Sequence, residues 1–432
     1  MKRRTFISQV GKAAAAVSLP FLLPSGRLFA ATGSRIANHV VLCLFSGGVR
    51  NIESMHMEEG NLMPNTIAGD APISADIAPG MTPLPRVVQT PLQRFGTLFR
   101  EFRFMQGPTA HVSGHLTTLT GTYFVNGHNP KKRSPYPTIF EYYRKHNEPQ
   151  KSAINAWWIA ERNDPFNICN YSEHEKYGPA YGANYFHPYA LLGRDNRSIL
   201  GGETLTSLLT NDKINNLRFL VNAQFRLAGN FIYPAFGNTP EDILRIDAFI
   251  KKCAAESAQG LYDDPYGIGK EAMNEDLYNI YFAQKVLTEF KPELLIVNMM
   301  AIDRGHTDFT LYCNNIRKGD YALARLWQTI QEDETLRDDT ILIAVPEHGR
   351  NLKPNTLKDK YGRYALDHTS DKTSREIFCL VLGPKHKVVQ NQVIKSVYGE
   401  SIDIAATIAR ILGFHDKTKL LLKGKFLEPA FV

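Results

Sequence analysis

Past its first 31 residues, the sequence of 432 residues contains no apolar run near the roughly 20 residues that a membrane-spanning helix needs. Cysteine is scarce, with five residues in all, and no spacing between them resembles a zinc-binding motif. Acidic residues are missing from residues 1–31. These absences exclude a multi-span membrane protein and a cysteine-ligated zinc domain. They also make the start of the chain unlike the rest.

The overall charge depends strongly on that first segment. The formal charge is +7 and the isoelectric point is near 9.0, which would suit a polyanion binder. Five unopposed cations lie within the first 31 residues: Lys2, Arg3, Arg4, Lys12 and Arg27. The remaining chain is nearly neutral, so we expect no nucleic-acid partner. Hydrophobic residues make up 43% of the sequence, enough for a large folded core.

Residues 1–33 have the layout of a signal peptide. A basic tip precedes an apolar stretch at 13–23 and small residues near Gly33, where a cleavage site fits. Arg3-Arg4 followed by Thr-Phe-Ile resembles the twin-arginine signal, and an ordinary secretory signal or lipid-surface helix is the alternative. We therefore predict export to the periplasm or beyond, and no transmembrane span after signal removal.

Export to an oxidising compartment changes what the cysteines imply. Cys43 and Cys379 lie inside apolar runs and are predicted to be inert core residues. Cys169, Cys253 and Cys313 could supply one disulfide.

Residues 34–432 are predicted to form one α/β domain with a mostly parallel central sheet and helices on both faces. Apolar runs of strand type are nearly continuous, as in strands buried on both sides, and lie at 39–45, 102–105, 153–159, 294–302, 340–345 and 377–382. Helical spacing is found at 92–100, 138–145, 276–290, 321–332 and 402–412. Residues 163–273 are rich in Asn, Tyr, Gly and Pro and read as a long insertion.

Polar clusters follow or precede the predicted strands. Three pairs of a carboxylate and a histidine stand out: Asp303 with His306, Glu347 with His348, and Asp367 with His368. Because ligands bind beyond the carboxyl ends of parallel strands, these pairs should meet at one edge of the sheet. Imidazole and carboxylate groups suit zinc, manganese and similar divalent ions. Arg50 and Arg350 are predicted on the same edge, where either could clamp an oxyanion or form an ordinary salt bridge.

Several motifs in order along the chain resemble those of the alkaline phosphatase superfamily. TPLQRFGTLFREFRF at 90–104 and AHVSGHLTTLTGTY at 110–123 are similar to a sulfatase segment that runs up to and past the nucleophile. DRGH at 303–306, PEHGR at 346–350 and DHT at 367–369 are similar to the later metal motifs. The set looks closest to a sulfatase-like branch of Tat-exported bacterial proteins of mostly unknown function.

The resemblance implies a site with one or two divalent ions, zinc first, with manganese or calcium as alternatives. It implies Asp303, His306 and His368 as ligands of a first ion, and Glu347 and His348 as ligands of a second. Glu347 stands where the superfamily usually has aspartate, and Asp303 is three residues before His306 where four are usual.

Two further positions depart from the family pattern. Ser46 falls where the first-strand aspartate is expected, and a hydroxyl is a poorer cation ligand. His111 falls where the nucleophile is expected, so a formylglycine route is excluded in this register. His111 could act as a ligand or a general base, and Thr109 or Ser113 could substitute as nucleophile after a shift.

These observations lead to three hypotheses. The first is an exported metal-dependent hydrolase of phosphate or sulfate esters, acting on a small anionic substrate. The second is a catalytically degenerate relative that binds an envelope protein as a scaffold component. The third is a carbohydrate-binding module built on Trp157-Trp158 and the tyrosine-rich run at 172–189, although packing in the core and the cap is the favoured role of these aromatic residues.

Overall fold

The central element of the protein is an eight-stranded sheet of order β10-β4-β9-β8-β3-β7-β5-β6. Our computed structural model describes residues 21–22, 28–29, 35–147, 153–160, 166–188 and 237–432. The strands of the sheet are β3 (His39–Phe45), β4 (Gly96–Arg103), β5 (Ala156–Ile159), β6 (Asn184–Phe186), β7 (Leu294–Met299), β8 (Thr340–Pro346), β9 (Glu376–Leu382) and β10 (Gln392–Glu400). All neighbours pair in parallel except β9, which is antiparallel to both β4 and β8.

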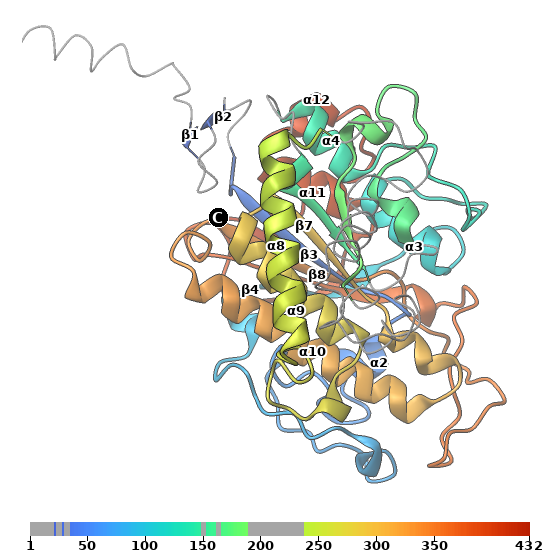
Figure 1. Cartoon of the computed structure of the whole chain (residues 1–432). Helices are drawn as coiled ribbons and strands as arrows, with labels where there is room; N and C mark the ends of the chain where they lie inside the picture. Colours follow the sequence, from blue (N-terminus) through green and yellow to red (C-terminus); the bar gives the residue numbers. More distant parts are fainter. Residues whose placement is uncertain (1–20, 23–27, 30–34, 148–152, 161–165, 189–236) are drawn as a thin grey trace, which may run out of the picture.

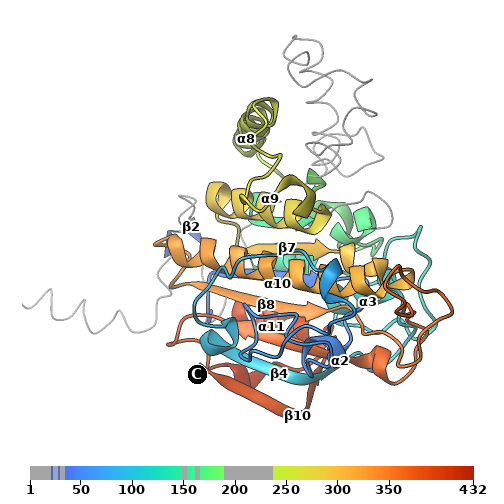
Figure 2. The same cartoon turned by 90° about the horizontal axis from the view of Figure 1, so that it is seen from below.

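The helices lie on both faces of this sheet (Figures 1 and 2). Their bounds are α2 (Asn51–Ser54), α3 (His111–Thr120), α4 (Ile139–His146), α8 (Pro240–Ala258), α9 (Glu275–Phe290), α10 (Phe309–Glu332), α11 (Asp403–Ile411) and α12 (His415–Thr418). A separate antiparallel pair, β1 (Phe21–Leu22) and β2 (Leu28–Phe29), lies outside the sheet. The predicted mostly parallel α/β architecture is therefore confirmed.

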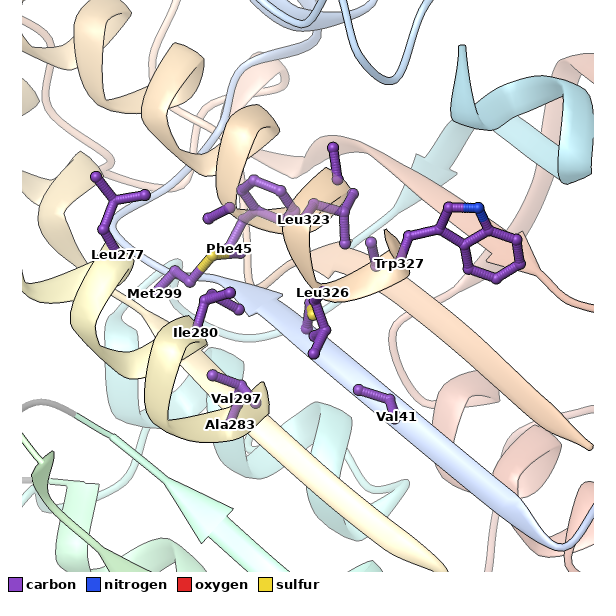
Figure 3. Packing of buried hydrophobic residues seen from close by; sticks show 14 of the residues in the cluster. Val41, Phe45, Leu277, Ile280, Ala283, Val297, Met299, Leu323, Leu326 and Trp327 are labelled. Atoms are coloured by element: carbon purple, nitrogen blue, oxygen red, sulfur yellow. The ribbon is translucent and has the colours of Figure 1, made fainter. Parts of the chain in front are cut away.

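Two apolar layers sandwich the sheet because successive side chains of a strand point to opposite faces. Val41 and Phe45 of β3 pack in one cluster with Leu277 of α9 and Leu326 of α10, and Figure 3 shows this layer. Val40, Leu42 and Leu44 of the same strand pack in the other cluster, with side chains of α3, α4 and α11. Continuous hydrophobicity in β3 thus reflects burial on both sides.

The parallel register brings the ends of three central strands together. Phe45, the last residue of β3, lies opposite Met299 of β7 on one side and Pro346 of β8 on the other. The segments that leave these strands begin at one edge of the sheet. α3, which follows β4, and the loop that leads into antiparallel β9 meet the same edge.

The predicted helix at 92–100 is wrong, since only Leu92–Phe95 forms a short 3-10 turn and β4 follows from Gly96 to Arg103. Its apolar residues fit a helical stripe, but β4 has neighbours on both edges and buries Leu98, Phe99 and Phe102 between the helical layers. Periodicity alone does not separate a short buried strand from a helix. The helix expected at 321–332 begins earlier, at Phe309, where Asp308 caps it by accepting a hydrogen bond from the Leu311 N–H at 2.7 Å.

The surroundings of the cysteines and tryptophans settle two expectations about individual side chains. All five cysteines are free and buried, so the chain forms no disulfide and the expectation of one is wrong. Cys169 belongs to the opposite apolar layer from Cys253 and Cys313, and Figure 2 shows α9 lying between α8 and α10, which carry the latter two. Trp157 and Trp158 are fully buried in β5, which confirms their favoured role in the core and rules out a surface wall on which a sugar could stack.

The predicted insertion at 163–273 contributes to the fold where it is described. β6 extends the sheet at its edge by pairing with β5, and α8 lies outside α9. Residues 163–165 and 189–236 of the insertion, and most of the predicted signal peptide, lie outside the described residues. Within the described ranges, none of the helices combines the length and apolar character that crossing a membrane requires.

Candidate metal centre

The carboxyl edge of the sheet gathers the histidines and carboxylates that the sequence singled out. They come from four places: the first turn of α3, a 3-10 helix after β7 (Ala301–His306), the end of β8, and the loop before β9. Their ligand atoms form two groups, each within 4.8 Å, among the described residues: His111, Asp303, His306 and His368 in the first, and His111, Glu347 and His348 in the second. All five predicted metal ligands and His111 are thus brought together, with His111 shared.

Glycine makes this close approach possible. Gly47, which follows β3 with φ of 90°, lies so close to the 3-10 helix that a Cβ would be 2.2 Å from the backbone nitrogen of Asp303. Any other residue would be strained by the left-handed backbone and would push the two segments apart.

Asp303 is the centre of the first group. Its Oδ1 lies 3.2 Å from Nε2 of His111, 3.3 Å from Nε2 of His306 and 3.9 Å from Nε2 of His368. Burial alone would raise the pKa of this carboxyl, but its contacts with His111, His306 and His368, together with the charge of His111, outweigh burial and hold the pKa well below its usual range. Asp303 is therefore a carboxylate, available to a cation.

Hydrogen bonds at the far side of the rings fix the tautomers of two histidines. Nδ1 of His306 lies 2.7 Å from Oδ1 of Asp367, and Nδ1 of His368 lies 2.5 Å from the carbonyl oxygen of Thr109. Since both partners are acceptors, each Nδ1 carries a hydrogen and each Nε2 presents a lone pair. These two Nε2 atoms are only 2.8 Å apart. Two lone pairs at that distance repel unless a cation or a proton lies between them.

Glu347 and His348 of the second group are completely buried, whereas His111 is partly exposed. Oε1 of Glu347 accepts a hydrogen bond from the Gly47 N–H at 2.6 Å and lies 2.7 Å from Nδ1 of His111. Nε2 of His348 is 3.4 Å from the same oxygen and has no hydrogen-bond partner among the described residues, while its Nδ1 donates to the Gly349 carbonyl. Burial lowers the pKa of His348 well below its usual value, so the ring is neutral and its Nε2 is open to a ligand bond.

His111 links the two groups by standing between Asp303 and Glu347. Burial alone would lower its pKa, but the charges and hydrogen bonds of the two carboxylates raise the pKa of His111 to about 10. Without a cation, the ring is therefore an imidazolium that donates to both. A cation that uses His111 must displace one of these protons.

Behind the second group lies a polar network that the sequence analysis did not predict. Nδ1 of His115 is 2.7 Å from Oε2 of Glu347, and its Nε2 is 2.8 Å from the hydroxyl of Ser46 and 2.7 Å from Oδ1 of Asn298. Ser46 also donates to Asn298. The hydroxyl at the position where the family pattern has aspartate is thus engaged by β7 and α3. The family pattern already places Ser46 at the site, and His115, one helical turn after His111, is the other sequence signal for this network.

The other predicted site residues are engaged by the protein itself. Arg350 is fully buried and donates to Oδ1 of Asp303 at 3.1 Å. Arg50 donates to Glu53 and to backbone carbonyls of the loop after β8. The hydroxyl of Thr109 accepts a hydrogen bond from the Ser370 N–H at 2.8 Å. Substrate binding by either arginine, and catalysis by Thr109, remain predictions.

A cavity of about 290 Å³ gives access to the first group. It is lined by Glu275, Met300, Ala301, Asp303, Arg304, His306 and Thr307. Arg304 is exposed on this wall, which makes it a cation that an anionic ligand would meet before reaching the histidines. Arg304 lies within the DRGH motif, but the motif alone predicted no role for it.

Asp276 of α9 supports the segment that carries Asp303. Its Oδ1 accepts hydrogen bonds from the Met300 and Ala301 N–H groups at 2.6 and 3.0 Å, and its Oδ2 has no partner among the described residues. Burial raises the pKa of Asp276 to about 7. Because the folded state holds this proton more tightly than the unfolded chain, its contribution to stability is complete below about pH 4 and is lost as pH rises to 7.

Asp276→Asn should remove that pH dependence, since an amide does not ionise. The wild type should lose about 2–3 kcal/mol of stability between pH 5 and pH 8 through Asp276, and the variant should not. The free energy of unfolding of the variant minus that of the wild type should therefore be larger at pH 8 than at pH 5 by this amount. Urea unfolding at the two pH values measures it. Glu275→Gln is the matched control, because that neighbouring side chain is partly exposed. If the free energies of unfolding of Asp276→Asn and the wild type differ by the same amount at both pH values, Asp276 does not have a raised pKa.

No family model matches the chain, and no curated protein matches its sequence. Among solved structures it is similar to a protein in the alkaline phosphatase superfamily from Vibrio parahaemolyticus, with 13% identity, a TM-score of 0.41, and 99% of this chain and 79% of that chain covered. It is also similar to the lipoteichoic acid synthase LtaP from Listeria monocytogenes (13% identity, TM-score 0.41, coverage 93% and 78%). A third is a phosphonate monoester hydrolase from Silicibacter pomeroyi (12% identity, TM-score 0.41, coverage 90% and 76%). At such identities the chemistry must be inferred from the side chains of the cluster.

Proposed function

We propose that the chain is an exported, metal-dependent hydrolase of phosphate or sulfate esters. The observation that carries this proposal is the pair of Nε2 atoms of His306 and His368, which face each other at 2.8 Å with both Nδ1 atoms bound to acceptors. When neither Nε2 carries a hydrogen, this arrangement is unfavourable for the protein alone, and a cation between the two nitrogens would make it favourable. Export by a twin-arginine-type signal is part of the proposal and is supported by the sequence of residues 1–33.

The donor set fits one or two divalent ions of the zinc type, with nitrogen and carboxylate ligands. Asp303, His306 and His368 would hold one ion, and Glu347 and His348 a second, with His111 able to join either. When bound, such ions supply Lewis-acid polarisation of a phosphoryl or sulfuryl oxygen and of a water nucleophile.

The chain's own residues have separable tasks around this centre. Asp367 and Thr109 hold the rings of His306 and His368 in the ligand-competent tautomer. His111 is 22% exposed, faces Asp303 and can hold or release a proton at Nε2 next to a substrate. Arg304 offers a guanidinium to an ester anion that enters the cavity.

A specific observation favours the second candidate, a scaffold role in the cell envelope with a protein partner. The Ser46 hydroxyl is bound to Asn298 and His115, and the ring of His111 lies between two carboxylates. In this state the Ser46 hydroxyl is not free to bind a cation, and the His111 ring is not free to attack an ester. A chain that binds no metal and turns over no substrate would have this role.

Metal content and turnover of the purified protein separate the two candidates. We expect the wild type to contain stoichiometric transition metal and to hydrolyse 4-nitrophenyl phosphate or sulfate. His306→Ala/His368→Ala should lose both properties. The matched control is His386→Ala/His415→Ala, which removes two histidines outside the cluster and should retain both. Absence of metal and turnover in the wild type after metal addition would favour the scaffold role.

A further inference from the structure

Two loops border the metal centre at the carboxyl edge of the sheet. One, residues 351–366, follows β8 and is tied to the centre by Asn355, whose Nδ2 donates to the carbonyl of His306 at 2.9 Å. The other, residues 123–136, follows α3. Figures 1 and 2 show both loops, in dark orange and teal, projecting from the same side of the molecule. We call residues 123–136 and 351–366 together the rim.

The rim exposes large apolar side chains, and their contact with water is unfavourable. Leu352, Leu357 and Tyr364 of the second loop, and Val125 and Tyr136 of the first, are between 45 and 59% exposed. Single exposed apolar residues are common on protein surfaces, but three on residues 351–366 and two on residues 123–136, in loops that project from the same side of the molecule, indicate an interaction site.

The unpaired charges of the rim are all positive. Lys353, Lys358 and Lys360 are exposed, and none of them has an ion-pair partner among the described residues. The lone carboxylate of residues 351–366, Asp359, is buried and accepts hydrogen bonds from backbone N–H groups, including that of Thr310 at 2.9 Å. Residues 123–136 contain no acidic residue and add two exposed lysines, at 131 and 132.

The remaining cations of the rim face the protein and not its surroundings. Arg363 forms ion pairs with Glu59 and Asp76 at the base of its loop. Arg133 stacks on the ring of Tyr171, with its guanidinium carbon 3.2 Å from the ring centroid. The exposed charged side chains of the rim are therefore all lysines, beside the five apolar side chains and a few neutral polar residues such as Asn126, Asn129 and Thr356.

We propose that the rim docks on an anionic lipid surface. Leucine, valine and tyrosine side chains suit the boundary between headgroups and acyl chains, and lysines next to them are attracted by anionic headgroups. A soluble polyanion would satisfy the lysines but would leave Leu352 and Leu357 in water. This surface goes beyond the proposed hydrolysis and does not depend on it, since its residues are separate from the metal ligands.

A tryptophan introduced into the rim reports this contact directly. The three native tryptophans are buried, so brominated acyl chains should not reach them. We expect L357W in the full-length chain to be strongly quenched by vesicles of brominated phosphatidylglycerol and only weakly by brominated phosphatidylcholine. The matched control is L244W, because Leu244 is 69% exposed on α8, far from the rim in Figure 2. Quenching of L357W no greater than that of L244W would overturn the proposal.

The charge contribution is tested in the same assay. Each lysine near an anionic membrane contributes about fivefold in affinity, so K353Q/K358Q/K360Q in the L357W background should bind the vesicles about a hundredfold more weakly. K251Q/K252Q on α8 is the control for a change of net charge. Residues 1–34 are identical in all variants, and differences in quenching at position 357 therefore report the rim. Tight binding to dextran sulfate without quenching by anionic vesicles would overturn the lipid assignment.

Discussion

Zinc at about 100 times its dissociation constant is expected to raise the free energy of unfolding of the wild-type chain by about 2.7 kcal/mol. The reason is that the ligands come from four segments that only folding brings together. An unfolded chain presents His111, Asp303 and His368 at unrelated distances, so the ion binds the folded state alone. Thermal or urea unfolding with and without zinc measures the effect, and it needs no knowledge of the substrate.

His306→Ala/His368→Ala should abolish this stabilisation, since it removes two nitrogens of the first group. The zinc-free variant should fold, because both rings are only partly buried and one unfavourable nitrogen contact disappears with them. His386→Ala/His415→Ala should respond to zinc as the wild type does. If the cluster variant and the wild type are stabilised equally, the ion binds elsewhere, and the metal centre is wrong.

His348→Ala asks whether the second group holds an ion of its own. The Nε2 of His348 is fully buried and has no hydrogen-bond partner among the described residues, whereas the first group can be reached from the cavity. A site with two ions predicts that this variant keeps part of the zinc stabilisation and loses half of the bound metal. A site with one ion in the first group predicts full stabilisation in the same variant.

The sequence predicted the site better than it predicted some of the elements around it. Asp303, His306, Glu347, His348 and His368 follow or precede strands that are recognisable as buried apolar runs. The parallel register then forces their loops to one edge. The helix expected at 92–100 is wrong because the apolar residues of this segment fit a helical stripe by chance, and periodicity alone does not separate a short buried strand from a helix.

The contacts that give the histidines their tautomers could not be predicted from the sequence. The partner of His368 is the backbone carbonyl of Thr109, and a carbonyl is present at every residue. Only the path of the loop between β4 and α3 brings this one within reach. The partners of Arg350 could not be predicted from the sequence either, because they are mainly backbone carbonyl oxygens. Its sequence position next to a metal motif suggested substrate binding, whereas its structural surroundings indicate a buried support.

Arg350→Met is expected to lower the free energy of unfolding by about 3–5 kcal/mol, as removal of one partner from a buried charged network does. The guanidinium donates to the carbonyls of Gly48 and Leu366 and to Oδ1 of Asp303, so it joins the segments after β3, after β7 and before β9. Methionine fills a similar volume but satisfies none of these acceptors. Urea unfolding of the wild type and the variant measures the loss.

Arg304→Met is the matched control, because Arg304 lies in the same motif region but is exposed on the cavity wall. Its effect on stability should stay within about 0.5 kcal/mol. Arg350→Lys should recover only part of the loss, since an ammonium group cannot match the planar fork that reaches three acceptors at once. If Arg350→Met instead left stability unchanged and raised only the KM for an ester, Arg350 would be a substrate-binding residue. The buried contacts described above would then not be what holds the site together.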